Sequence, residues 1–356
     1  MIISVSAFLT HLAFAAAIFV LSAALTWFMM RRIRILDVPT ERSSHTRPVP
    51  KSGGVAIVAA FGVAALIIYF VASVARIDDR HFWGFLITGL LLAIVSFVDD
   101  VNQKSFFAKV GTQMLCVTVM LAFGVVVTRL WIPLAGEVYL GGWGYVLTFL
   151  WIIGLTNAFN FMDGLDGLAG GVALIAAVFL CAIAITQYSL YVYVTSYALL
   201  ASVAGFLVFN FPPAKIFMGD VGSAFLGFAF ATLAVIGANL DLGHLSFYVV
   251  PMLLFQFIFD TVVTFVRRLL AGEKVYLAHR THLYQLLNRI GYSHRAVALF
   301  HLLYFGLYRP SRAIAYRHAP AVATRPIDYS QRMVAVSTFC AAISVVTIIA
   351  MAPGWP

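Results

Sequence analysis

The sequence predicts an all-α, polytopic integral membrane protein with about 10 to 11 transmembrane helices. Of its 356 residues, 62% are hydrophobic and only 10% are charged. The mean hydropathy is +0.97. A soluble domain needs more polar surface than this composition provides, so the apolar runs must face lipid.

Apolar runs of about 20 residues, enough to cross the hydrocarbon core as a helix, can be marked along the whole chain. The expected spans are 7–30, 53–75, 82–98, 110–128, 143–158, 169–187, 190–209, 222–240, 245–266 and 333–351. A further run at 296–308 has only 13 residues and is either a short span or a re-entrant segment. The first run is longer than the apolar part of a signal peptide, and basic residues follow it, so we expect it to be kept as a helix.

We expect a single integral membrane domain over 1–356, because no soluble domain or low-complexity linker interrupts the apolar runs. The motifs described below lie within a core at 31–295. The remaining tail, at 309–356, is atypical, since 309–332 contains five arginines that would face outward if 296–308 spans the membrane.

The distribution of lysine and arginine predicts the orientation of the chain. The loops at 31–52, 99–109, 159–168, 211–221 and 267–295 carry 15 of these residues, whereas those at 76–81 and 129–142 carry 3. Because basic loops are retained in the cytoplasm, the first set is expected inside and the N-terminus outside, which is periplasmic in a bacterial inner membrane.

The net charge of +9 does not indicate nucleic-acid binding, because basic segments between apolar runs are typical of a cytoplasmic membrane face. The three cysteines lie in apolar runs without a CxxC pattern or a histidine at ligand spacing, so neither a disulfide nor a metal-thiolate site is expected.

Aspartates are placed at the mouths of successive expected helices, all on the inner side. They are Asp99, Asp100, Asp163, Asp166 and Asp220. Acids near lipid are costly, so we expect these to converge on one cytoplasmic cavity. Clustered carboxylates are hard ligands for Mg²⁺ or Mn²⁺, and Mg²⁺ usually combines one or two carboxylates with substrate phosphates. The sequence therefore predicts a site for metal and phosphate.

Glycines accompany the acids in NAFNFMDGLDGLAGG (157–171) and in FMGDVGS (217–223). In both stretches a helix is expected to start, and the free backbone N–H groups of a helix start attract phosphate. Gly164 is the candidate glycine for a close approach of phosphate, and Asn160 is the candidate amide beside the acids.

Basic partners for a phosphate also lie in the inner loops. Lysine and arginine can clamp a diphosphate, and the candidates are Lys51, Lys109 and Arg280. His279 and His282 in the HRTH stretch are spaced to share one helix face, and histidine can orient or protonate a phosphate.

Each feature also has a purely structural interpretation. The DGLDG stretch could cap a helix, and the aspartate pair at 99–100 could mark a membrane boundary. The HRTH stretch could be a solvated basic face. Asp260 lies inside an apolar run, where it could be a buried hydrogen-bonded strut or could line the cavity.

Taken together, the stretches NAFNFMDGLDGLAGG, FVDD, FPPAKIFMGDVGS and HRTH resemble the polyprenyl-phosphate N-acetylhexosamine-1-phosphate transferases. The resemblance covers residues 31–295, with the motifs in the family's order. It implies transfer of a sugar 1-phosphate from a UDP-sugar to undecaprenyl phosphate, with release of UMP and with Mg²⁺ or Mn²⁺, in the bacterial inner membrane.

The resemblance also implies roles for individual residues. Asp99 and Asp100 match paired aspartates implicated in metal contact and acceptor activation, and Asp220 matches a metal-binding aspartate. Asp163 matches a polar position of the central motif.

Four further positions match the family's motifs. Asn160 belongs to the central motif, Lys109 matches a lysine of the second inner loop, and His279 and His282 stand where the family has histidines near the diphosphate.

The histidine stretch differs from that of the peptidoglycan enzymes, and this difference indicates the branch of the family. The peptidoglycan enzymes have consecutive histidines, whereas HRTH followed by LYQLL is more similar to the branch that initiates O-antigen and lipopolysaccharide from UDP-N-acetylaminosugars. The alternatives are the peptidoglycan or teichoic-acid branch, a transporter of lipid-linked glycans, and a membrane scaffold. We expect the protein to bind the lipid bilayer, a UDP-N-acetylaminosugar and undecaprenyl phosphate, and not to bind nucleic acid. A homodimer is compatible with the sequence.

Overall fold

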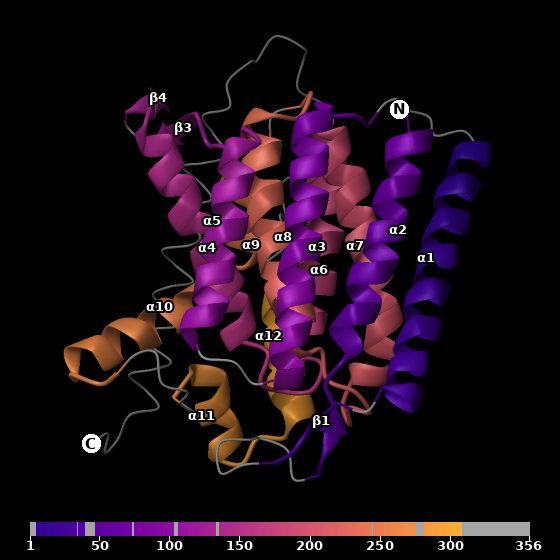
Figure 1. Cartoon of the computed structure of the whole chain (residues 1–356), viewed down its shortest axis with the longest axis vertical. Helices are drawn as coiled ribbons and strands as arrows, with labels where there is room; N and C mark the ends of the chain where they lie inside the picture. Colours follow the sequence, from indigo (N-terminus) through magenta and orange to yellow (C-terminus); the bar gives the residue numbers. More distant parts are fainter. Residues whose placement is uncertain are drawn as a thin grey trace.

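The computed structural model describes residues 5–33, 35–39, 47–72, 75–102, 106–132, 135–243, 245–274 and 281–307. It is a bundle of long, roughly parallel helices, which confirms the all-α fold class (Figure 1). Within the described residues, seven helices are long and apolar enough to cross a membrane. They are α1 Val5–Arg32, α2 Gly53–Val71, α3 Asp79–Asn102, α5 Trp143–Phe161, α6 Leu168–Thr186, α7 Leu190–Asn210 and α8 Gly219–Asn239.

Shorter elements complete the bundle. The short helices are α4 Phe106–Ala122, α9 Val249–Leu253, α10 Phe255–Leu270, α11 Leu283–Arg289 and α12 His294–Leu307. Two antiparallel ribbons join helices: β1 Leu36–Asp37 pairs with β2 Val49–Pro50, and β3 Arg129–Ile132 pairs with β4 Gly136–Tyr139. The expected span at 333–351 lies outside the described residues.

Helix α8 is the centre of the bundle. Every residue from Val221 to Gly237 is buried, and the helix packs against α3, α5 and α2. A Cβ on Gly227 would lie 2.8 Å from the Leu155 carbonyl oxygen of α5, so glycine permits this close packing. The position of α8 matters because its first turn carries Asp220.

Two buried threonines of α5 bond to carbonyls of their own helix. Thr148 donates to the Gly144 carbonyl at 2.7 Å, and Thr156 donates to the Ile152 carbonyl at 2.6 Å. Such back-bonding satisfies a hydroxyl where no water is available, so these residues need no functional explanation.

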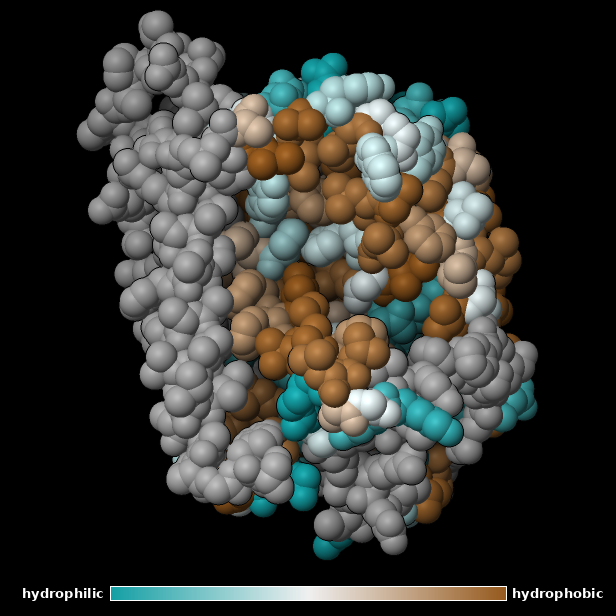
Figure 2. Space-filling view, turned by 90° about the vertical axis from the view of Figure 1, so that its left-hand side faces the viewer, coloured by the Kyte–Doolittle hydropathy of each residue, from teal (hydrophilic) through white to brown (hydrophobic). Residues whose placement is uncertain are grey.

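The described residues of the loops expected on the inner side gather at one end of the molecule, as expected from the sequence. In Figure 1, β1 and α11 lie at the lower end, whereas the start of α1 and the β3–β4 ribbon lie at the upper end. In the view from the side, hydrophobic residues cover most of the described surface, and hydrophilic ones gather at its upper edge and in its lower half (Figure 2). This distribution is that of a protein surrounded by lipid.

The expected span at 245–266 differs from the structure, which divides it into α9 and α10. Helix α10 carries a polar stripe at four-residue spacing: Asp260, Thr264 and Arg268 are buried. Its opposite face exposes apolar side chains such as Val262 and Phe265. A helix with this pattern presents its polar side to the protein, which explains why α10 is not a uniformly apolar span.

The short run expected at 296–308 forms α12, which packs against α6. The described part of α12 has 14 residues.

An apolar groove of about 510 Å³ runs between α1, α2, α3 and α8. Its inner end is lined by Val98 and Val221, which are the sequence neighbours of Asp99 and Asp220. It extends along α2 as far as Leu66. A hydrocarbon chain suits this lining.

Candidate active site

Backbone hydrogen bonds join the segment before α2 to the segment before α8. Gly53 donates its N–H to the Phe217 carbonyl at 3.0 Å, and Phe217 donates to the Pro50 carbonyl at 2.7 Å. A Cβ on Gly54 would overlap the backbone of Gly222, so only glycine allows the two helix starts to approach this closely. Two inner loops distant in sequence thus form one wall of the site.

Lys51 and Asp100 meet at this wall. The Lys51 Nζ lies 3.3 Å from Oδ1 of Asp100, and the Asp100 side chain is only 4% exposed. Gly219 has φ +71°, and a Cβ there would lie 2.8 Å from Oδ2 of Asp100. The glycine therefore leaves room for the carboxylate beside the first turn of α8.

Lys109 joins the two remaining acids of this cluster. Its ammonium lies 2.7 Å from Oδ2 of Asp99 and also contacts Oδ2 of Asp220. Asp99 is 4% exposed, whereas Asp220 and Lys109 are 28% and 37% exposed. The lysine thus neutralises a buried and a solvent-accessible carboxylate at once.

Asn160, in the last turn of α5, donates hydrogen bonds to Oδ1 of Asp220 at 2.9 Å and to Oγ of Ser223 at 2.8 Å. Asn157, one turn earlier, has a different partner, since its amide donates to Oε1 of Gln113 at 2.6 Å. The two asparagines of the motif are therefore divided between the acid cluster and the α4–α5 contact.

Asp163 follows α5 and is partly buried. Burial raises the pKa of its carboxyl to about 8, and the negative charges of Asp220, Asp100 and Asp166 contribute. A carboxyl group with this pKa is largely protonated at neutral pH, so it can donate a proton or a hydrogen bond.

Asp166 holds three segments together. Its carboxylate accepts a hydrogen bond from the Ala214 N–H at 3.0 Å and lies 3.2 Å from Nδ1 of His294. Burial alone would raise the pKa of Asp166, but the His294 and Ala214 contacts outweigh it and hold the pKa below its usual value. Nearby, the Gly167 N–H donates to Oδ1 of Asn210. These contacts fix the loop that carries Asp163.

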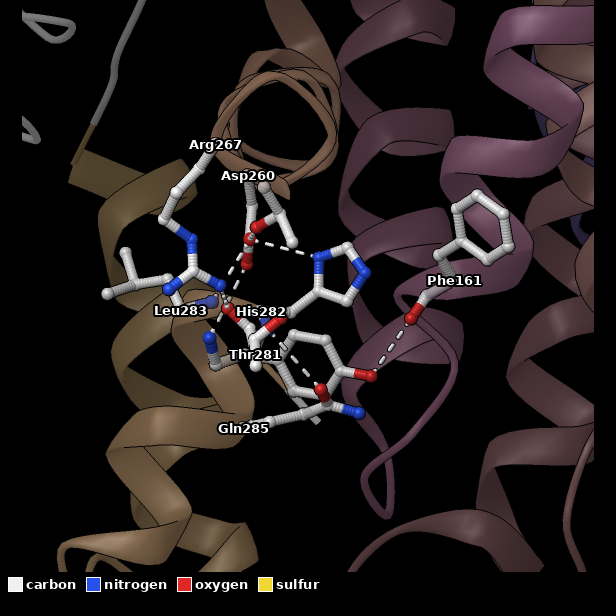
Figure 3. A network of polar contacts seen from close by, with 9 residues as sticks. Phe161, Asp260, Arg267, Thr281, His282, Leu283 and Gln285 are labelled. Atoms are coloured by element: carbon white, nitrogen blue, oxygen red, sulfur yellow. Dashed lines mark hydrogen bonds and ion pairs between the residues drawn. The ribbon is translucent and has the colours of Figure 1, made fainter. Parts of the chain in front are cut away.

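His282 is brought against the same loop by a network of polar contacts (Figure 3). Its Nδ1 lies 3.1 Å from Oδ1 of Asp260, which also accepts the Leu283 N–H at 3.0 Å. The Tyr284 hydroxyl donates to the Phe161 carbonyl at 2.9 Å. The network therefore links α10 and α11 to the end of α5.

The structure gives Gly164 a packing role. A Cβ there would overlap the Tyr284 hydroxyl, so its lack of a side chain is explained by that tyrosine without any phosphate. His279 and Arg280 lie outside the described residues. The remaining site residues expected from the sequence lie at the inner end of the bundle.

A divalent cation fits part of this site. Oδ1 of Asp99 and Oδ2 of Asp100 are buried and have no hydrogen-bond partner within the described part of the chain. Hard carboxylate oxygens such as these suit Mg²⁺. No group of three or more His, Cys, Asp or Glu residues placed for a metal occurs among the described residues, so a cation here would need oxygens from a substrate as well.

Three contributors were not singled out from the sequence. Ser223 accepts the Asn160 amide, Asn210 accepts the Gly167 N–H, and Tyr284 bonds the end of α5. Ser223 follows Asp220 by three residues, a spacing that places both on one helix face and that could have identified it.

Comparisons with known proteins identify a family. Residues 82–238 match the model of glycosyl transferase family 4. This match contains Asp99, Asp100, Asn160, Asp163 and Asp220.

Curated relatives match over most of the chain. It is 32% identical over 278 residues to a probable undecaprenyl-phosphate N-acetylglucosaminyl 1-phosphate transferase of Bacillus subtilis, covering 77% of this chain and 75% of the relative. It is 30% identical over 342 residues to a decaprenyl-phosphate N-acetylglucosaminephosphotransferase of Mycobacterium tuberculosis, covering 86% and 82%. A shorter match is to a phospho-N-acetylmuramoyl-pentapeptide-transferase of Levilactobacillus brevis. The two sequences are 42% identical over 105 residues, which cover 30% of this chain and 32% of the relative.

Proposed function

The chain belongs to the polyprenyl-phosphate N-acetylhexosamine-1-phosphate transferases of glycosyl transferase family 4, and from that premise we propose its substrates and its chemistry. We propose that it transfers an N-acetylaminosugar 1-phosphate from a UDP-sugar to undecaprenyl phosphate. UDP-N-acetylglucosamine is the first candidate donor, because the relatives that match over most of the chain are named for N-acetylglucosamine. The product would initiate O-antigen or a related surface polysaccharide.

One observation carries the proposal. Two lysines and three aspartates from α3, α4, α8 and the segment before α2 meet at one end of the bundle. Phosphoryl transfer depends mainly on positioning and on neutralising charge, and such a cluster provides both. The apolar groove that begins beside Asp99 and Asp220 supports a lipid substrate.

In the proposed reaction, a phosphate oxygen of the lipid attacks the β-phosphorus of the UDP-sugar. The bond from the β-phosphorus to the oxygen that bridges it to the α-phosphorus breaks, and UMP leaves with that oxygen. Lys51 and Lys109 bind the phosphates and offset their charge. Asp163, whose pKa of about 8 keeps it largely protonated, donates a hydrogen bond to a phosphate oxygen.

Mg²⁺ held by Asp100 and Asp220 together with substrate oxygens would supply further charge neutralisation. Asp99 and Asp100 face the acceptor phosphate in this proposal, and His282 orients the diphosphate together with His279 and Arg280. A route with an aspartate as nucleophile predicts a phospho-enzyme, which can be sought by incubating the protein with labelled UDP-sugar in the absence of lipid.

We also propose a bacterial inner-membrane location, with the N-terminus periplasmic and the acid cluster cytoplasmic, because basic residues concentrate in the loops at the acid end. A homodimer is compatible with this arrangement. A reporter fused to the N-terminus and scored for periplasmic activity tests the orientation.

The function is tested by UMP release from purified protein in lipid nanodiscs with undecaprenyl phosphate and MgCl₂. The donors are UDP-GlcNAc, UDP-GalNAc, UDP-FucNAc and UDP-MurNAc-pentapeptide, each with and without EDTA. We expect metal-dependent UMP release with an N-acetylaminosugar donor. Release only with the MurNAc-pentapeptide donor would indicate the peptidoglycan branch, and release with none of the donors would favour the transporter alternative.

A further inference from the structure

We propose that Asp260 is a positioning residue for the transfer reaction: it holds the His282 ring by accepting the Nδ1 proton, so that Nε2 serves the substrate. This inference rests on the proposed function and assigns a role to a buried acid of α10 that the acid cluster does not include. It is carried by the contacts of Asp260, by the stacking of His282 and by the position of both beside the Asp163 loop.

The Asp260 carboxylate has partners on both oxygens. Oδ1 lies 3.1 Å from Nδ1 of His282 and accepts the Leu283 N–H at 3.0 Å and the Thr264 hydroxyl at 3.1 Å. Oδ2 accepts the Tyr284 N–H at 3.4 Å. A buried carboxylate is tolerated only when it is satisfied in this way, and its strong donors fix its own orientation.

The ring of His282 is held on its faces as well as at Nδ1. It stacks on Phe161 with ring centroids 6.2 Å apart and an interplanar angle of 28°, and on Tyr284 at 5.9 Å and 23°. The side chain is 5% exposed. The imidazole is thus fixed in both position and tilt, as a group that acts on a substrate must be.

The remaining ring nitrogen points away from the carboxylate and towards the end of α5 (Figure 3). That end leads directly into the Asp163 loop, since Phe161, whose carbonyl accepts the Tyr284 hydroxyl, precedes Asp163 by two residues. A histidine whose Nδ1 donates to a carboxylate presents Nε2 in a defined state, and this orientation is a common use of a buried acid near catalytic histidines.

Asp260→Asn separates positioning from packing. Asparagine keeps the size of the side chain and places its amide oxygen where Oδ1 accepts the Leu283 N–H and faces Nδ1, but it lacks the negative charge that holds the Nδ1 proton. We expect kcat to fall roughly 10–100-fold, the loss typical of groups that orient a functional histidine, with little change in the KM for the UDP-sugar. Asp260→Glu restores the carboxylate and should recover part of the loss.

The chain offers a matched control at the opposite end of the bundle. Asp241 is also buried and accepts the Ser189 hydroxyl at 2.6 Å and the Val192 N–H at 3.1 Å at the start of α7. Asp241→Asn removes a comparable charge from a comparable setting, so it should affect stability without lowering kcat. Thr264→Val removes a different partner of Asp260 and leaves the contact with His282.

A second readout does not depend on turnover. Nitrogen NMR of protein labelled at histidine, with His282→Gln to assign the signal, reports which ring nitrogen carries the proton. We expect a protonated Nδ1 in the wild type and a larger share of the tautomer protonated at Nε2 in Asp260→Asn, because a neutral amide oxygen holds the Nδ1 proton less strongly than a carboxylate does. An unprotonated Nδ1 in the wild type, or an unchanged kcat in a folded Asp260→Asn protein, would overturn the inference.

Failure of the proposed function has a different signature. A wild-type protein that releases no UMP with any donor, while Nδ1 is protonated and responds to Asp260→Asn, would remove the transfer reaction and with it the positioning role. An active wild type with an Asp260→Asn variant of equal kcat would leave the proposed function intact and overturn this inference alone.

Discussion

Asn160 donates a hydrogen bond of 2.9 Å to Asp220, which joins the end of α5 to the first turn of α8. The two motifs that contain these residues are 60 positions apart in the sequence. Their contact makes the orientation of the Asp220 carboxylate depend on an amide of the central motif.

Asn160→Ala should therefore lower kcat by roughly 10–100-fold, because the Asp220 carboxylate loses the hydrogen bond that fixes its Oδ1 and can then rotate. Asn157→Ala is the matched control, since that asparagine contacts Gln113 instead of an acid. It should lower the melting temperature more than the activity. Equal losses of kcat in the two variants would contradict a special role for Asn160.

Lys109 bridges Asp99 and Asp220, and Lys109→Gln removes the charge that offsets both. We expect at least roughly a 100-fold loss of kcat/KM, since a phosphate clamp and a neutralising charge are lost together. The exposed Lys215, which lies in an inner loop at the same end, provides a control. Activity in Lys109→Gln equal to that in Lys215→Gln would be incompatible with the proposed clamp.

Asp163 should make the stability of the metal-free protein depend on pH. Its pKa in the folded state, about 8, lies above the usual value of 3.8, so between these values the folded state binds more protons than the unfolded state. Stability therefore falls as pH rises through this window, and it is greatest below the lower value.

The corresponding test is Asp163→Asn, which removes the carboxylate that burial and neighbouring charges disfavour. With EDTA present, the variant should melt a few degrees above the wild type at pH 8.5 and show no such gain at pH 4. A gain of equal size at both pH values would show that Asp163 is not held protonated.

Gly54 tests the wall that carries Lys51. A Cβ there would overlap the Gly222 backbone, whereas a Cβ on Gly62 of the same helix meets nothing within 4 Å. Gly54→Ala should lower both the yield of folded protein and kcat, because the two helix starts must separate. Gly62→Ala should leave the yield of folded protein unchanged or slightly raised. A well-folded and fully active Gly54→Ala protein would show that the close approach is dispensable.

The fold class and the grouping of the acids could be predicted from the sequence because each depends on a local signal. Apolar length identifies a span, and Asp99, Asp163 and Asp220 all end or begin one. Charge bias then places them on one side. These arguments need no knowledge of which helices are neighbours.

The partners of the acids could not be predicted in this way. Lys109 meets Asp220 across 111 positions, and no periodicity connects them. The role of Gly164 was also hidden, because the Tyr284 side chain that it accommodates comes from a distant helix. Such pairings depend on tertiary packing alone.

The sequence of helix α10 contains a polar periodicity that the apolar composition of the run 245–266 obscured. The run 245–266 is apolar enough to suggest a span, yet Asp260, Thr264 and Arg268 recur every four residues. This spacing places the three polar residues on one buried face of the helix. It indicates a helix whose polar face packs against the protein and whose apolar face contacts lipid.

The central claim is that the acid cluster transfers a sugar 1-phosphate to a lipid phosphate. The most direct measurement is the mass of the lipid product formed from UDP-GlcNAc and undecaprenyl phosphate by wild type and by Asp220→Asn, each with Mg²⁺ or EDTA. We predict undecaprenyl-diphospho-sugar and an equal amount of UMP only for the wild type with Mg²⁺, with the variant folded but inactive. Near-normal product from Asp220→Asn, or product formed equally in EDTA, would contradict the account.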